Sequence, residues 1–93
     1  MYVRMIIGEA TDDANMKELV KLAMEDTEVA RNPGFQGMQC LEEDGGRMVL
    51  IITSWITRED CVRYHASRAY RQFVPKTQHL LVGDFVVKLF RME

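Results

Sequence analysis

The chain has 93 residues, of which 47% are apolar and 28% are charged, and its formal net charge is −2. This length predicts a single domain over residues 1–93, and this balance is typical of a folded globular protein. No basic stripe points to a nucleic-acid partner. The longest apolar runs, Met48–Ile52 and Leu80–Gly83, are far too short to cross a membrane. We therefore expect a protein without a nucleic-acid or membrane partner.

Two further features bear on the cellular compartment. The chain begins with strand-like residues instead of the charged and apolar regions of a signal peptide. Its two cysteines, Cys40 and Cys61, follow no metal-binding spacing and are expected to be small buried side chains in a reducing compartment. These features predict a cytoplasmic protein without a bound metal.

The first third of the chain predicts a strand followed by a helix. Residues Tyr2–Ala10 are mostly β-branched and apolar, which favours a strand. Residues 11–13 (Thr-Asp-Asp) are candidate N-caps of a helix, which the turn at Asn32-Pro33-Gly34 is expected to end. One apolar stripe at spacings of three and four marks its inner face: Met16, Leu19, Val20, Ala23, Thr27 and Ala30.

The middle of the chain predicts a β-hairpin. Residues Phe35–Glu43 alternate between two faces and are rather polar, which is typical of an edge strand. Residues 44–46 (Asp-Gly-Gly) are a hairpin turn signal, so Arg47–Ile56 should run antiparallel to the strand before it. This next strand is apolar on both parities, and we expect both of its faces to be covered.

The last third predicts a second helix and a fourth strand. Thr57 is the expected N-cap, with Asp60 in a capping-box arrangement, and the helix should run from Arg58 to about Gln72 before Pro75 breaks it. Its expected inner stripe is Val62, His65, Ala66, Ala69, Tyr70 and Phe73. Residues 84–92 then form a strand that is again apolar on both parities.

The resulting order, βαββαβ, predicts a ferredoxin-like α+β fold with a four-stranded antiparallel sheet. Right-handed crossovers place both helices on the same face of the sheet. The other face carries apolar side chains, and no element of the chain remains to cover it. We therefore expect a homodimer in which two sheets pack face to face or form a shared barrel.

Several short segments resemble a known family. They are residues 32–38 (Asn-Pro-Gly-Phe-Gln-Gly-Met), Trp55 at the end of a strand, and residues 65–67 (His-Ala-Ser) with Tyr70 on the second helix. Together they resemble the antibiotic biosynthesis monooxygenase-like family of the dimeric α+β barrel superfamily, over nearly the whole chain. The resemblance implies a cofactor-independent monooxygenase that acts on a small aromatic phenol or quinol with O₂. It also leaves open a non-catalytic barrel that binds small molecules.

The same family includes haem-degrading enzymes. Their Trp-to-His spacing carries over to Trp55 and His65, and in that branch the helix histidine ligates iron. That branch also has an Asn on strand one, where this chain has Ile7. Because of the shared Trp-to-His spacing, haem binding or degradation is a further alternative, from which the chain departs at Ile7.

Three residues are candidates for catalysis, and each also has a purely structural interpretation. Trp55 is either the wall of a cavity that stacks on a planar substrate or a cap on the core. His65 is a base or hydrogen-bond partner for a phenol, with a pKa lowered by burial, or else a core histidine. Tyr70 either donates to a substrate oxygen or is a core aromatic. The side chains that we expect to line the pocket are Ile7, Ile51, Thr53, Val62, Ala66 and Ala69.

Overall fold

The computed structural model describes residues 1–93 and confirms the predicted order of elements. It adds two short 3₁₀ helices, and it divides the second predicted helix in two. The elements are β1 Tyr2–Glu9, α1 Asp13–Glu25, η1 Val29–Arg31, β2 Phe35–Glu42, β3 Met48–Trp55, α2 Arg58–His65, α3 Arg68–Thr77, η2 Gln78–Leu80 and β4 Val86–Arg91.

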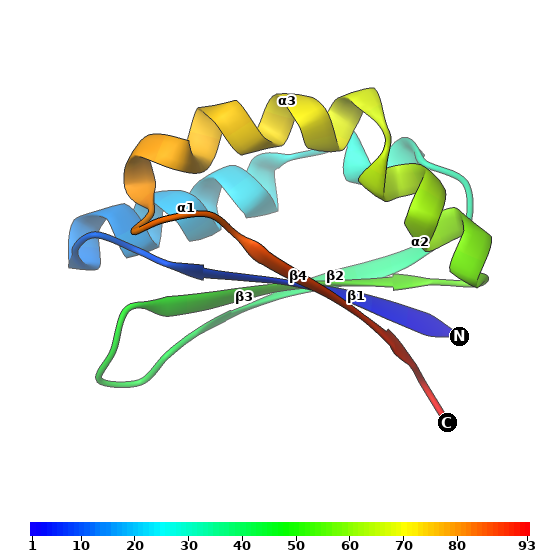
Figure 1. The fold of residues 1–93 in the computed structure, drawn as a ribbon, viewed down its shortest axis with the longest axis horizontal. Coiled ribbons are helices and arrows are strands. Elements are labelled where there is room, and N and C mark those ends of the chain that lie inside the picture. Colours follow the sequence, from blue (N-terminus) through cyan, green and yellow to red (C-terminus); the bar gives the residue numbers. More distant parts are fainter.

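The four strands form one antiparallel sheet in the order β2-β3-β1-β4. Figure 1 shows all the helices on one face of this sheet, with the other face bare. The ferredoxin-like α+β prediction is confirmed, and β2 lies at an edge as expected. None of the helices is both long enough and apolar enough to span a membrane.

Helix α1 begins where the sequence indicates and ends earlier. The carboxylate of Asp12 accepts a hydrogen bond from the Asn15 backbone N–H, which caps the first turn. The helix ends at Glu25 because Asp26 adopts an extended conformation, and its side chain accepts from the Glu28 N–H instead. The predicted continuation of the stripe through Thr27 and Ala30 is therefore wrong: both are exposed, and Val29 in η1 is the buried residue.

The second predicted helix is interrupted at Ala66 and Ser67. The capping box of Thr57 and Asp60 is confirmed at the start of α2. Ser67 then starts α3, with its hydroxyl accepting from the Tyr70 N–H at 3.2 Å. A serine that caps a new helix competes with continuing the old one, which explains the break. Pro75 lies inside α3, so the prediction that it ends the helix is wrong.

The break shifts the helical phase and changes which side chains point inward. On α2 the buried residues are Cys61 and Tyr64, whereas Val62 and His65 are exposed, as is Ala66 just after the helix. The predicted inner stripe is therefore wrong for α2, although it holds for Tyr70 and Phe73 on α3.

Strand β2 contains an irregularity that the alternation did not reveal. Phe35 pairs with Trp55, and Gly37 pairs with Ser54, so the register shifts by one residue between them. Phe35 therefore lies on the helix-covered face with Met38, where simple alternation placed the two on opposite faces.

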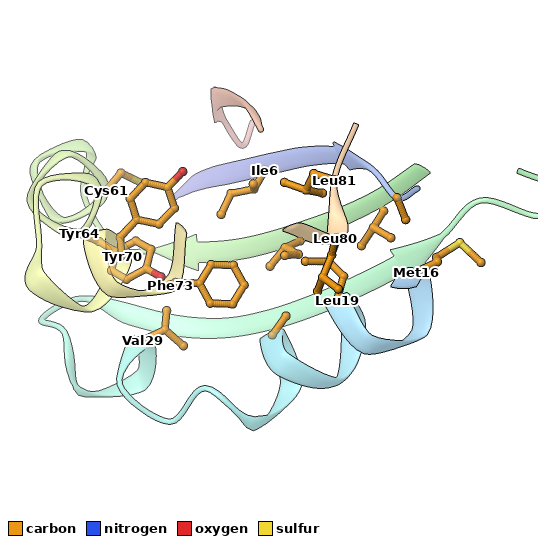
Figure 2. Close-up of a cluster of buried hydrophobic side chains, with 14 of the residues drawn as sticks. Ile6, Met16, Leu19, Val29, Cys61, Tyr64, Tyr70, Phe73, Leu80 and Leu81 are labelled. Atoms are coloured by element: carbon orange, nitrogen blue, oxygen red, sulfur yellow. The ribbon is translucent and has the colours of Figure 1, made fainter. Parts of the chain in front are cut away.

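The core between sheet and helices has two different ends (Figure 2). We call Trp55, Tyr64, Tyr70 and Phe73 the aromatic end, and Met16, Leu19, Leu80 and Leu81 the aliphatic end. All eight side chains are buried. The two ends lie along the same helix-covered face of one sheet.

The bare face of the sheet is apolar, as predicted. The register places Met5 opposite Ile52 and Ile7 opposite Leu50 on this face, and these side chains are half-buried by their neighbours alone. Phe90 of β4 is 47% exposed. No helix or loop of the chain packs over these residues (Figure 1).

Candidate functional site

A cleft of about 380 Å³ opens between α2 and strands β1 and β4. Its walls are mostly apolar, and two nitrogen-bearing side chains reach it, which is the usual composition of a small-molecule site. The residues that line it are Arg4, Cys61, Val62, His65, Val87 and Leu89. A wider hollow beside the β2–β3 turn, about 910 Å³, is lined almost entirely by polar and charged residues and is a poorer match to an aromatic ligand.

His65 is the last residue of α2, and its ring is held by Arg4. Nη2 of Arg4 lies 2.8 Å from Nδ1 of His65. An arginine side chain can only donate, so Nδ1 is the acceptor and carries no proton. The neutral ring therefore has its proton on Nε2. Burial lowers the pKa of His65, and the charge of Arg4 lowers it further, which confirms the predicted direction of the shift even though the side chain is more exposed than expected.

Arg4 was not anticipated from the sequence, and it is the most unusual side chain in the molecule. It is 2% exposed, and its Nε and Nη1 atoms have no hydrogen-bond partner. Its guanidinium carbon lies 4.1 Å from the centre of the Tyr70 ring and 5.1 Å from that of Tyr64. None of the five ion pairs in the structure includes Arg4. The signal available in the sequence was a single charge within the apolar run of β1.

Trp55 lies behind this arrangement and not on the wall of the cleft. It is fully buried, and its indole N–H donates to Oγ1 of Thr53 at 2.9 Å. Its ring stacks on Tyr64 with centroids 5.0 Å apart. The Thr53 hydroxyl in turn donates to the backbone carbonyl of Arg4 at 3.4 Å. The position agrees with the interpretation of Trp55 as a cap on the core.

The rings of the two helix tyrosines, Tyr64 and Tyr70, pack against the Arg4 guanidinium. Tyr70 is buried, and its ring centroid lies 5.2 Å from that of His65, so it touches both polar groups of the cleft. Tyr64, which the sequence pattern placed away from the core, is buried between Trp55 and Tyr70. Burial raises the pKa of Tyr64 to about 12. It therefore remains a neutral, electron-rich surface for the guanidinium at neutral pH.

The predicted pocket residues are distributed over several parts of the molecule. Val62 lines the cleft together with His65. Ile51 and Thr53 are buried under the helices, and Ile7 lies on the opposite face of the sheet. The remaining two, Ala66 and Ala69, lie at the exposed end of α2 and beside a separate cavity of about 280 Å³ between α1 and α3. Cys61, not predicted to line the pocket, does so, and burial raises the pKa of its thiol.

Comparisons with known proteins find the fold and not a close relative. No protein-family model and no curated protein matches the sequence. Among solved structures, it is similar to the monooxygenase from the ActVA-Orf6 gene of Streptomyces coelicolor, whose structure holds the ligand nanaomycin D. That similarity has a TM-score of 0.87 at 18% identity and covers 99% of this chain and 87% of the other.

Two further structures give the same result. SnoaB, a cofactor-independent oxygenase from Streptomyces nogalater, is similar with a TM-score of 0.77 at 16% identity, over 98% of this chain and 91% of that one. A proposed antibiotic biosynthesis monooxygenase from Deinococcus radiodurans has a TM-score of 0.81 at 17% identity, over 100% and 93%. The chain therefore has the fold of the antibiotic biosynthesis monooxygenases, and the resemblance inferred from its sequence is confirmed at the level of the fold.

Proposed function

We propose that this protein is a cofactor-independent monooxygenase that oxidises a small aromatic phenol or quinol with O₂. The observation that carries the proposal is the cleft itself: Val62, Val87 and Leu89 offer apolar walls for a ring, and His65 and Arg4 offer polar groups for its oxygen. The shared fold with proteins described as monooxygenases supports the same activity. No cofactor is required if the substrate is itself the reductant.

The chemistry follows from ionisation of the substrate. An aromatic hydroxyl that loses its proton becomes electron-rich enough to reduce O₂ directly. One oxygen atom enters the ring system as a quinone oxygen and the other leaves as water, so the substrate supplies all four electrons. The protein has to bind the ring, exclude water and favour the ionised form. We assign contact with the substrate oxygen to His65, and positioning from behind the cleft to Trp55 and Tyr70.

Oxygen uptake in the presence of a model naphthol or anthrone tests this proposal. Wild type should consume O₂ faster than the buffer control, and His65→Ala should lower the rate by about a hundredfold, the usual order for losing a group that handles a proton or hydrogen bond in the transition state. His79→Ala, at the second histidine, which does not line the cleft, should leave the rate unchanged. Equal rates for wild type and His65→Ala, or no uptake at all, would instead identify a binding protein without turnover.

Haem is a poorer match to this cleft. A histidine that ligates a metal generally donates its second ring N–H to a carboxylate or carbonyl. Here the partner of His65 is Arg4, which itself donates, so a neutral ring keeps its proton on the remaining nitrogen. Ile7, the position of the Asn in the haem-degrading branch, lies on the far face of the sheet. A titration with haem should therefore show no shifted Soret band.

We further propose that two copies associate through their bare sheet faces in the cytoplasm. Apolar side chains such as Ile7, Leu50 and Phe90 line this face, and a patch of this kind is uncommon on a monomer. Two free cysteines agree with a reducing compartment. Sedimentation at micromolar concentration should give twice the 10.8 kDa mass of one chain. Leu50→Lys should reduce the sedimenting mass to that of one chain. A wild-type protein that sediments as a single chain would contradict this proposal.

A further inference from the structure

We propose that Arg4 and His65 together form a binding site for an anionic oxygen on an aromatic ligand, so that the ligand is bound as its phenolate. The guanidinium supplies the countercharge, and the Nε2–H of His65 supplies the hydrogen-bond donor. The choice of an aromatic phenol as the ligand rests on the proposed function. The binding it describes requires no turnover.

Arg4 carries a positive charge that no group in the protein pairs with. A buried guanidinium normally has a carboxylate partner, because an unpaired charge in a protein interior is costly. Arg4 is 2% exposed and has no such partner, and two of its three nitrogens make no hydrogen bond. The rings of Tyr64 and Tyr70 offset part of this charge. The face of an aromatic ring offers only a partial negative charge, so a net positive charge remains beside the cleft.

No other group around the cleft neutralises that charge. From α2 the cleft receives Cys61, whose thiol is kept neutral by a raised pKa, together with Val62 and His65. From β4 it receives only Val87 and Leu89. Asp60, at the start of α2, is paired with Arg63 and with the N-terminus of the helix. An anion from the ligand is the complement that this wall lacks.

The His65 ring presents a proton, and not a lone pair, at its free nitrogen. Because Nδ1 accepts from Arg4, the neutral imidazole presents an N–H to the ligand and not a lone pair. The ring is therefore a hydrogen-bond donor to an oxyanion, and it does not serve as the base while this bond is intact. The phenolic proton passes to solvent, and the phenolate accepts a hydrogen bond from His65 beside the positive charge of Arg4. Of the functional roles that the sequence leaves open for His65, this contact favours the hydrogen-bond partner over the base.

The apolar part of the cleft specifies the rest of the ligand. Val62 and Leu89 are 48% and 39% exposed in the free protein, so both have surface that an aromatic ring can cover. An aryl ring with a single ionisable oxygen matches this combination of walls and donors. A phenolate and an aryl carboxylate share this chemistry, and the experiment separates them.

The test is an anaerobic spectroscopic titration with 4-nitrophenol, which changes absorbance on ionisation. Wild type should bind the anion about tenfold more tightly than the neutral phenol, which lowers the pKa of the bound probe by about one unit. Arg4→Met should abolish this shift. Arg47→Met removes the same charge at an exposed position far from the cleft and should keep it. Benzoate that displaces the probe less well than a phenol of similar size would identify the phenolate as the preferred ligand.

Several results would overturn the inference. They are an unshifted pKa of the bound probe in wild type, an equal shift in Arg4→Met, or no binding of the probe at millimolar concentration. If benzoate displaces the probe at a lower concentration than the phenol of similar size, the assignment of a phenolate as the preferred ligand is rejected. If Arg4→Met does not fold, Arg4→Lys provides the check, because it keeps the charge and should retain most of the shift. If the pKa of the bound probe is shifted but the naphthol and anthrone assay shows no oxygen uptake, the monooxygenase proposal is contradicted and the anion site is still supported.

Discussion

The two ends of the core lie on the same face of one sheet and differ in the polar groups that they contain. At the aliphatic end, Leu19, Leu80 and Leu81 fill the space between sheet and helices with side chains that have no polar atoms. At the aromatic end, Tyr64 and Tyr70 share their space with a buried cation, and a cleft opens beside them.

The difference separates stability from chemistry. Aliphatic packing contributes hydrophobic burial at little electrostatic cost. Burying Arg4 without an anion costs free energy, and a fold selected for stability alone would have an apolar residue there. The unpaired charge at this position therefore fits the proposed anion site at the aromatic end, whereas the aliphatic end contributes packing alone.

The largest expected effect on stability is at the aliphatic end. Leu19→Ala removes a fully buried side chain and should lower the free energy of unfolding by about 2–5 kcal/mol, measured by urea denaturation. Val62→Ala, at a half-exposed position on the cleft, should cost about 1 kcal/mol or less and yet weaken binding of 4-nitrophenol. If Val62→Ala were as destabilising as Leu19→Ala, the two ends would not differ in the way described.

Arg4→Met should have the opposite profile. Replacing an unpaired buried charge with an apolar side chain of similar length should leave stability unchanged or raise it by about 1–4 kcal/mol. The same variant should lose the preference for the phenolate. A urea denaturation that showed a loss of several kcal/mol would mean that the contacts of Arg4 with Tyr64 and Tyr70 are mainly structural.

The break between α2 and α3 should be detectable at a smaller scale. Ser67→Ala removes the hydroxyl that caps α3 and should cost about 1 kcal/mol, since that is the usual contribution of an N-cap. Ser54→Ala, on a strand and outside any cap, is the matched control. Because His65 and Tyr70 lie on opposite sides of the break, the cap variant should also raise the Kd for the probe.

The smallest effect concerns pH. The pKa of His65 is lowered from its ordinary value of 6.5, so the unfolded chain binds this proton more tightly than the folded protein. Stability should therefore fall as the pH drops through 6.5, and this loss should level off below the folded-state pKa. Urea midpoints at about pH 7.5 and about pH 5.5 measure it. In His65→Gln the part of this stability loss that is due to His65 should be absent. A pH dependence equal to that of wild type would contradict the lowered pKa of His65.

Much of the fold could be predicted from the sequence, because its signals are local and mutually consistent. The alternation of β2, the turn at residues 44–46 and the capping box of Thr57 each indicate one element, and the order βαββαβ leaves few topologies. The helix break was missed because Ser67 reads equally well as a residue inside a continuous helix. The shifted register at Phe35 was missed because an irregularity in pairing depends on the partner strand, which no local pattern reveals.

The site was predicted less well, for a physical reason. His65 and Val62 were identified and do lie on one cleft. Arg4 was missed because the importance of a lone charge in a strand depends on what it meets across 61 positions of sequence, and only the folded chain supplies that contact. Ile7 was expected in the pocket, but the pleat of β1 directs it to the opposite face.

The most direct test of this account is the protonation of the His65 ring, measured by long-range ¹H–¹⁵N NMR at neutral pH. The chain has only two histidines, so His79→Gln assigns the signals. An imidazole that accepts from Arg4 should show its proton on Nε2 and none on Nδ1, and Arg4→Met should release this preference. A ring protonated on Nδ1 in the wild type would contradict the Arg4–His65 contact, and with it the anion site.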